Sequence, residues 1–421
     1  MRRKTIVAPW LFLLFLLSLS PCVSAIPANV EKAGHWVGTW TSAPQLAASS
    51  DEPPPPGFAD STLRQIVHVS LGGSKLRVRF SNAFGKAALT IISAHIAKAA
   101  GSSAIQPGSD KPLTFSERSS CTIPAGALIY SDPIDFALAP LSDLAVTIYL
   151  ESLPDGLTTH SGARATSYFT SGDAVSATEL SSAHFVNHWF FLNGVDVMQS
   201  DSSEVVAVLG DSITDGKNST TDGNRRWPDE LARRLPADKH TVDIGVLNEG
   251  IGGNRLLRDG LGPNALARLD RDVLTQAGVR WLIVLEGVND IGTCKDACDL
   301  ESVSRDIIAA YQQIILRAHS QNIRVYGATI TPFGGSAYAT PETERARQAV
   351  NRWIRTRGHF DAVIDFDPVL RTPNNWSNLS PISDSGDHLH PNDAGYKAMA
   401  DSIDPKLFDK RRITLRPSCR D

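Results

Sequence analysis

The chain has 421 residues, of which 42% are hydrophobic and 20% are charged, and its formal net charge at pH 7 is −4. This length predicts two domains, and this share of apolar residues excludes general disorder. The acidic balance argues against nucleic-acid binding, and a mean hydropathy of −0.13 with one long apolar stretch excludes a polytopic membrane protein.

The N-terminus has the features of a secretory signal peptide. A basic segment precedes an apolar run at 6–19, and a small-x-small cleavage site ends at Ala25. We therefore expect cleavage of residues 1–25, a secreted protein that is extracellular or periplasmic, and no stable membrane insertion after processing. The alternatives are a retained membrane anchor and lipidation at Cys22, although Pro21 stands where a lipoprotein signal has Gly or Ala.

Residues 36–198 lack sustained helical periodicity and contain short runs typical of β-strands. Residues 76–80 alternate apolar with polar side chains, as a strand with one buried face does. Runs at 144–150 and 183–197 are rich in β-branched or aromatic residues, and turns containing Gly and Pro separate such runs. We expect an N-terminal accessory domain over 36–198 that is a jelly-roll-like β-sandwich.

The pattern changes after a short polar linker near 199–203. Apolar runs at 205–209, 242–247, 281–285, 325–330 and 362–366 alternate with helical stretches at 227–235, 265–277, 302–320 and 343–355. Continuous apolar strands that alternate with helices predict a parallel sheet covered by helices on both faces. We therefore expect an α/β domain over 203–405, followed by a C-terminal tail at 406–421.

Polar residues follow three of these strands, where an open parallel sheet binds its ligands. Ser212 follows the first strand in a Gly-Asp-Ser-Ile-Thr-Asp-Gly turn, and its hydroxyl and N–H could both face a substrate. Gly253 follows the second strand and lets the backbone approach a ligand closely. Asn289 follows the third strand and offers a neutral amide donor. Taken singly, these residues also fit a helix N-cap, a flexible turn and an Asx turn.

A histidine pair lies before the last helix, in Asp387-His388-Leu389-His390. The Asp-x-x-His spacing lets Asp387 hold the Nδ1–H of His390, so that Nε2 can face Ser212. His388 is the competing base, but it lacks this spacing. The chain thus has a nucleophile, a base, its orienting acid and three oxyanion donors, which is what acyl transfer requires.

These residues resemble the blocks of the SGNH hydrolase superfamily, the GDSL-type esterases and lipases. Gly210–Ile213 resembles the first block, Gly253 the second, Gly287–Asp290 the third, and Asp387 with His390 the fifth. The resemblance implies a flavodoxin-like three-layer domain. It also implies that Ser212 is the nucleophile, His390 the base and Asp387 the orienting acid, with an oxyanion hole formed by Ser212 N–H, Gly253 N–H and the Asn289 side chain.

The resemblance extends upstream of these blocks. Trp36–Trp40 and Leu63–His68 resemble the start of the accessory β-domain in a secreted subgroup that is similar to bacterial acetyl xylan esterases. Asn254 and Arg255, beside the second block, are candidates for contact with an acyl or sugar group, with an exposed loop pair as the alternative. Loop aromatics are candidates for stacking on a sugar ring: Phe333, Tyr338 and Trp376.

Four cysteines remain after processing, namely Cys121, Cys294, Cys298 and Cys419. Export favours disulfides, and four cysteines allow three pairings. Cys294 and Cys298 are close enough to pair on a surface loop, which leaves Cys121 with Cys419. A metal site is the alternative, but the chain has no His or second Cys pair at zinc spacing.

Together these features predict a secreted serine esterase that removes short acyl groups, such as acetyl from plant polysaccharide like acetylated xylan, and that needs no cofactor or metal. Its partner is an acylated polysaccharide or a small ester. A lipase or aryl esterase with the same residues is the alternative within ester chemistry. Outside it, the alternative is a carbohydrate-binding protein with an inert hydrolase domain.

Overall fold

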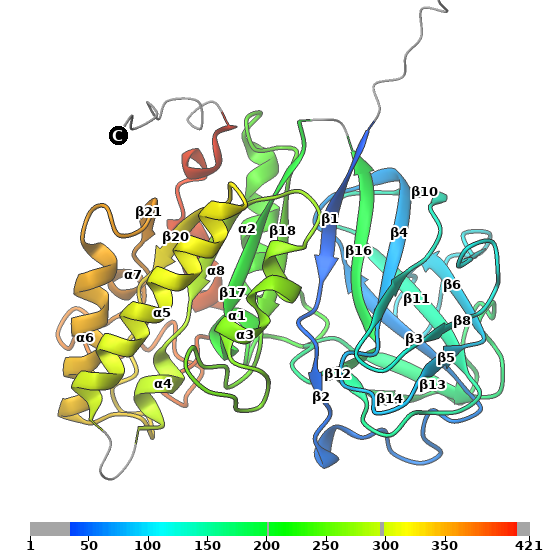
Figure 1. Cartoon of the computed structure of the whole chain (residues 1–421), viewed down its shortest axis with the longest axis horizontal. Helices are drawn as coiled ribbons and strands as arrows, with labels where there is room; N and C mark the ends of the chain where they lie inside the picture. The colour runs from blue at the N-terminus through cyan, green and yellow to red at the C-terminus, as the bar shows by residue number, and fades with distance from the viewer. Residues whose placement is uncertain (1–33, 200–201, 295–298, 411–421) are drawn as a thin grey trace, which may run out of the picture. The chain divides into compact units, whose positions relative to one another are not determined.

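The computed structural model describes residues 34–199, 202–294 and 299–410, all within one unit that begins at Gly34 (Figure 1). The expected signal peptide, Cys298 and Cys419 lie outside the described residues, as does most of the expected tail. Among the helices of the described residues, none is long and apolar enough to cross a membrane.

The N-terminal half is built from short antiparallel strands (Figure 1). They are β1 (His35–Thr41), β2 (Gln45–Leu46), β3 (Ser61–His68), β4 (Gly73–Ser81), β5 (Leu89–Ile91), β6 (Ser93–Lys98), β7 (Lys111–Pro112), β8 (Cys121–Ile123), β9 (Leu128–Tyr130), β10 (Ile134–Leu138), β11 (Asp143–Leu150), β12 (Thr158–His160), β13 (Ser167–Ser171), β14 (His184–Val186), β15 (Trp189–Phe190) and β16 (Leu192–Gln199). The larger sheets have the orders β1-β16-β4-β10, with β9 also on β4, and β14-β13-β3-β11-β6-β7; the smaller ones are β15-β12-β2 and β5-β8.

Alternation places apolar side chains of both large sheets in one core. Leu76, Val78 and Phe80 of β4 belong to the same buried cluster as Val146 and Ile148 of β11. These positions are two residues apart in each strand, so they share one face of their sheet. The predicted β-rich character is confirmed, and the sandwich arrangement stays a prediction.

The C-terminal half has one parallel sheet of five strands with helices between them (Figure 1). Its strands are β17 (Glu204–Gly210), β18 (Ile244–Gly250), β19 (Val279–Leu285), β20 (Arg324–Ala328) and β21 (Ala362–Ile364). Its helices are α1 (Ser212–Asp215), α2 (Trp227–Arg234), α3 (Ala265–Leu269), α4 (Val288–Gly292), α5 (Leu300–Ser320), α6 (Pro341–Arg355), α7 (Asp367–Leu370) and α8 (Asp393–Ser402). The predicted α/β domain with a parallel sheet is confirmed.

The strand order is β18-β17-β19-β20-β21, which is the doubly wound order 2-1-3-4-5. Because the chain moves from β17 to β18 in one direction and onward to β19 in the other, right-handed crossovers put α2 and α5 on opposite faces of the sheet. Accordingly α2 packs against α8, whereas α5 packs against α6 and α3. The predicted helix 265–277 ends earlier, because α3 gives way to a π-turn at Asp270–Leu274.

The N-terminal half covers the edge strand β18 of the parallel sheet. The N–H of Gly38 in β1 donates to the Ala277 carbonyl at 2.9 Å, and the N–H of Val246 donates to Ser70 Oγ at 3.1 Å. A Cβ at Gly38 would lie 2.8 Å from Leu247 Cδ1, so a larger residue there would displace the Leu247 side chain of β18. These contacts cover one edge of the parallel sheet, which could otherwise pair with a strand of another chain. The predicted domain limits near 199–203 stay a prediction.

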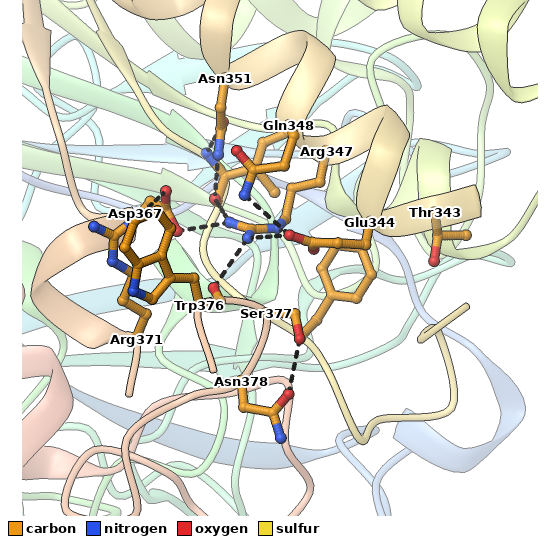
Figure 2. Close-up of polar contacts among 12 residues, drawn as sticks. Thr343, Glu344, Arg347, Gln348, Asn351, Asp367, Arg371, Trp376, Ser377 and Asn378 are labelled. Atoms are coloured by element: carbon orange, nitrogen blue, oxygen red, sulfur yellow. Dashed lines mark hydrogen bonds and ion pairs between the residues drawn. The ribbon is translucent and has the colours of Figure 1, made fainter. Parts of the chain in front are cut away.

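A buried arginine holds the segment that leads toward Asp387 and His390. Figure 2 shows Arg347 of α6 between Glu344, Asp367 and the backbone of Trp376. Its guanidinium lies 2.8 Å from Asp367 Oδ1 and 2.7 Å from Glu344 Oε2, and it donates to the Trp376 carbonyl at 3.3 Å. Because the Arg347 side chain has no exposed surface, these partners offset the cost of burying its charge.

Candidate active site

The strand order reverses between β17 and β19, and a ligand crevice is expected beyond the carboxyl ends of these strands. Ser212 follows β17 and Asn289 follows β19. Both line a pocket of about 250 Å³, together with Gly253 and His390. The topology therefore brings four of the residues singled out in the sequence to one cavity.

Three predicted residues form a hydrogen-bonded chain at this pocket. Ser212 Oγ lies 2.8 Å from His390 Nε2. On the other side of the ring, His390 Nδ1 lies 2.7 Å from Asp387 Oδ2. His388 is turned elsewhere, with Nδ1 2.5 Å from Asp384 Oδ2, and is about half exposed. The geometry thus joins Ser212 to His390 and leaves out the competing base.

The turn after β17 fixes Ser212 at the start of α1. Asp211 is the N-cap and accepts the N–H of Ile213 at 2.9 Å, while Gly216 ends the helix in the left-handed region at φ +86°. A Cβ at Gly210 would lie 2.1 Å from Thr214 Oγ1, so the turn needs glycine there. As the first helical residue, Ser212 has an N–H without an acceptor inside the helix.

The pKa values of Asp387 and His390 both lie below the ordinary values of these side chains. Partial burial alone would raise the pKa of Asp387, but hydrogen bonds from the backbone and ring of His390 and from the Leu389 N–H hold it well below its usual range. Burial lowers the pKa of His390, and the charges of Lys217 and Arg164 act in the same direction against the opposing pull of Asp387. At neutral pH His390 is therefore neutral and can accept a proton, and Asp387 is ionised.

Sequence reasoning missed a donor to the acid. Asn218 Nδ2 donates to Asp387 Oδ2 at 2.9 Å and to Ser385 Oγ at 2.8 Å. Asn218 lies after α1, about 170 residues before Asp387 in the chain. An asparagine in a loop gives no sequence signal for such a contact, because the fold alone brings the two segments together.

The Asn289 amide is fixed by contacts on both of its polar atoms. Nδ2 donates one hydrogen to the Asn254 carbonyl at 2.9 Å, and Oδ1 accepts the Tyr338 hydroxyl at 2.9 Å. An amide NH₂ has two hydrogens, so one remains for a ligand in the pocket. Tyr338, expected only as a sugar-stacking aromatic, therefore has a second role in orienting this amide, which the sequence did not indicate.

The glycine loop after β18 is tied to the loop after β19. Asp290 accepts the N–H groups of Leu256 and Leu257 at 2.9 and 3.1 Å. Gly253 stands at φ +69°, a conformation that favours glycine, and faces the pocket. The two loops thus hold the Gly253 backbone and the Asn289 side chain at the same cavity.

Asn254 and Arg255, the candidates for substrate contact, are not among the residues that line this pocket. The Asn254 side chain is buried, where Nδ2 donates to the Pro263 carbonyl and Oδ1 accepts from Arg268 at 2.8 Å. Arg255 donates to Thr293 Oγ1 at 3.2 Å and does not line the cavity. Asn254 is instead a support for the loop, since its own carbonyl receives the Asn289 amide.

The three aromatic candidates lie in different surroundings. Phe333 is buried in the core, and Trp376 is 60% exposed with the Arg371 guanidinium 4.2 Å from its ring centroid. Tyr338 does line the pocket. Cys121 is a buried free thiol in the structure, and its suggested partner Cys419 lies outside the described residues. The pairing of Cys294 with Cys298 stays a prediction, because Cys298 lies outside the described residues.

Buried charge lies beneath the pocket. Burial raises the pKa of Asp211 to about 7 and that of Glu249 to about 8, and neighbouring carboxylates act in the same direction. Arg268, fully buried, donates to the carbonyls of Glu249 at 2.7 Å and Gly210 at 3.1 Å. It therefore ties together the ends of β18 and β17 under Ser212. Across the described ranges, no group of three or more His, Cys, Asp or Glu is arranged to hold a metal ion.

The N-terminal half contributes directly to the pocket. Gln45, Ser161, Gly162 and Arg164 line it alongside the residues of the α/β domain. His160 Nε2 lies 2.9 Å from Oδ1 of Asp215, the last residue of α1, and both side chains are buried. A role for this half, left open by the sequence, is therefore to form one wall of the cavity.

Comparison with known proteins adds a family assignment. Residues 208–398 match the sequence model of the GDSL-like lipase/acylhydrolase family. No curated protein matches the chain.

Similar solved structures include a lipase/acylhydrolase from Enterococcus faecalis, at 19% identity and TM-score 0.38, covering 49% of this chain and 96% of that one. They also include the acetylxylan esterase Axe2 from Geobacillus stearothermophilus, at 20% identity and TM-score 0.36, covering 51% and 95%. A GDSL-like lipase from Bacteroides thetaiotaomicron is similar at 17% identity and TM-score 0.37, covering 51% and 91%.

Proposed function

Because residues 208–398 belong to the GDSL-like lipase/acylhydrolase family, within the SGNH hydrolase superfamily, the protein is an ester hydrolase, and we propose that it is a secreted serine esterase specific for short acyl groups. The observation that carries the proposal is the hydrogen-bonded chain from Ser212 Oγ through His390 to Asp387. It supplies a nucleophile, a base and an orienting acid in contact with one another.

In the proposed mechanism Ser212 Oγ attacks the ester carbonyl carbon while His390 Nε2 takes the hydroxyl proton. The tetrahedral intermediate collapses when the carbon–oxygen bond to the alcohol breaks, and His390 gives its proton to the leaving alkoxide. Water then attacks the acyl-enzyme, and His390 again takes a proton. The carboxylic acid leaves and Ser212 regains its proton. Asp387 holds the imidazole in the required tautomer and stabilises its charged form.

The proposed oxyanion hole consists of the N–H groups of Ser212 and Gly253 and the free hydrogen of Asn289 Nδ2. Support comes from their common position on the pocket and from the contacts that fix the Asn289 amide. Donors fixed before the reaction stabilise the developing negative charge without reorganisation. Loss of one such donor costs about 10²–10³ in rate.

The acyl group is proposed to be short, with acetyl on plant polysaccharide such as xylan as the substrate. The cavity, of about 250 Å³, is smaller than most ligand pockets, which suits a small acyl group. Its apolar lining includes Leu261 and Leu389, beside several polar and charged side chains. A lipase or aryl esterase that uses the same residues is the alternative, and an inert domain on a carbohydrate-binding protein is the other.

Several features of the whole chain are also proposals. Secretion with cleavage after Ala25 rests on the N-terminal sequence. A sandwich over 36–198, ahead of the hydrolase domain 203–405, is supported by the core that both large sheets share. A disulfide between Cys294 and Cys298 rests on their spacing.

The test is acetate release from acetylated xylan, beside hydrolysis of 4-nitrophenyl acetate and 4-nitrophenyl palmitate. We expect activity on xylan and the acetate ester, almost none on the palmitate, and loss of all activity in Ser212→Ala. The matched control Ser320→Ala, at an exposed position, stays active. Undiminished activity in Ser212→Ala rejects the mechanism, and faster palmitate cleavage favours a lipase. Retention on xylan without hydrolysis favours the binding protein.

A further inference from the structure

Two cations face the pocket without a carboxylate partner. Arg164 and Lys217 both line it. Within the described part of the chain neither forms an ion pair, and the buried Nε of Arg164 has no hydrogen-bond acceptor. A half-buried guanidinium without a partner is costly, because its lost hydration is not replaced. Such a group is suited to a ligand that brings the missing negative charge.

The backbone holds Arg164 in place. Its φ is +49°, in the left-handed region that residues other than glycine rarely adopt. The Asp222 N–H donates to the Arg164 carbonyl at 2.9 Å, and Asp222 in turn accepts from Thr166 Oγ1 at 2.7 Å. On the other flank, Ser161 Oγ donates to Asp51 at 2.6 Å. The loop is thus fixed from both sides and presents the arginine in a preorganised position.

The carboxylate of Asp215, which also lines the pocket, does not cancel this charge. His160 Nε2 faces Asp215 at 2.9 Å, and His160 Nδ1 faces the Ala43 carbonyl at 2.8 Å. Asp215 is therefore engaged by His160, whereas neither Arg164 nor Lys217 has a carboxylate partner among the described residues.

Lys217 precedes Asn218, which donates to Asp387 Oδ2 at 2.9 Å, so this pocket-lining cation lies on the acid–base side of the pocket. Besides burial, the charges of Lys217 and Arg164 lower the pKa of His390, the group that protonates the leaving oxygen. A negative group near the two cations would thus belong to the alcohol component of the ester.

We propose that Arg164 and Lys217 form an anion-binding subsite that selects esters whose alcohol component carries a carboxylate, such as an acylated acidic sugar. The inference rests on the proposed esterase function and narrows its substrate class. The Arg164 guanidinium can bind a carboxylate through two parallel N–H hydrogen bonds, and the Lys217 ammonium group adds a second positive charge.

The first test uses two matched acetyl esters, 4-acetoxybenzoate and 4-acetoxybenzamide, which differ in the charge of the alcohol component. Wild type is expected to prefer the carboxylate ester in kcat/KM, with a preference that falls as salt rises. Arg164→Gln and Lys217→Gln should each reduce that preference by about tenfold, as expected for loss of a charge-assisted contact. Lys239→Gln, which removes an exposed lysine that does not line the pocket, should leave it unchanged.

A second test does not depend on turnover. Calorimetric binding of 4-hydroxybenzoate and 4-hydroxybenzamide to Ser212→Ala should show tighter binding of the carboxylate, and the added Arg164→Gln should remove the difference. Equal binding of the two compounds, or a preference that survives in the Arg164→Gln/Lys217→Gln double variant, overturns the subsite. The esterase proposal is judged separately, by hydrolysis of 4-nitrophenyl acetate in wild type and its loss in Ser212→Ala.

Discussion

Removal of a single hydroxyl tests how Asn289, the proposed oxyanion donor, is held. Tyr338→Phe deletes the group that donates to Asn289 Oδ1 at 2.9 Å and keeps the ring that packs against Gly292, where a Cβ would lie 2.1 Å from Tyr338 Cδ2. Without this donor the amide can turn its oxygen toward the pocket. A neutral hydrogen bond contributes about 1 kcal/mol, so kcat/KM should fall about fivefold. In Asn289→Ala, kcat/KM should fall by about 10²–10³, since this substitution removes the proposed oxyanion donor itself.

A double-mutant cycle separates orientation from other effects. If Tyr338 acts through Asn289, then Tyr338→Phe in the Asn289→Ala background should change kcat/KM on 4-nitrophenyl acetate by less than about twofold. Thermal unfolding of all variants controls for loss of the fold. The reasoning is refuted if the tyrosine substitution costs as much in the alanine background as in wild type, because its effect would then be independent of the amide.

Four further predictions test separate parts of the structure. Asn218→Ala should lower kcat/KM about fivefold through one lost hydrogen bond to Asp387, and Asn218→Asp should lower it further by placing a like charge there; equal losses would contradict this. Gly162→Ala puts a Cβ 1.7 Å from Asp215 Oδ2 and should destabilise the fold by about 1–3 kcal/mol in denaturant unfolding, with reduced activity; a neutral result would be unexpected. Arg347→Met should lower the free energy of unfolding by about 3 kcal/mol, because Asp367 and Glu344 lose a buried partner. Arg345→Met removes an exposed ion pair with Glu342 and should lower it by less than about 1 kcal/mol. The acid limb of the pH profile of kcat/KM should have its midpoint below pH 6.5, because His390 must be neutral and its pKa is lowered. Lys217→Gln should move this limb to higher pH, and an unchanged midpoint would contradict the effect of the Lys217 charge.

Much of the α/β half could be predicted because its signals are local. Uninterrupted apolar runs mark the strands, and helices such as α6 begin with a recognisable cap, in which Thr340 accepts the N–H of Thr343 and Pro341 takes the first position. Ser212, Asn289 and His390 follow from position, since residues after parallel strands and before the last helix meet at one edge of the sheet. These contacts depend on topology and not on the details of packing.

The missed and mistaken residues depend on tertiary contacts that no local pattern carries. Asn218 reaches Asp387, and Tyr338 reaches Asn289, only because distant loops fold over the pocket. Asn254 was a candidate for substrate contact, yet its side chain is buried and its Oδ1 accepts from Arg268. Arg164 gave no signal at all, since a lone arginine in a loop is normally a solvated surface residue.

The most direct test of the account is covalent labelling of the enzyme with diethyl 4-nitrophenyl phosphate, followed by mass spectrometry of its peptides. We predict one diethylphosphoryl group on the peptide that contains Ser212, esterase activity lost in proportion to labelling, and no labelling in His390→Ala. A label on another residue, or full activity in fully labelled protein, would contradict the assignment of Ser212 as the nucleophile activated by His390.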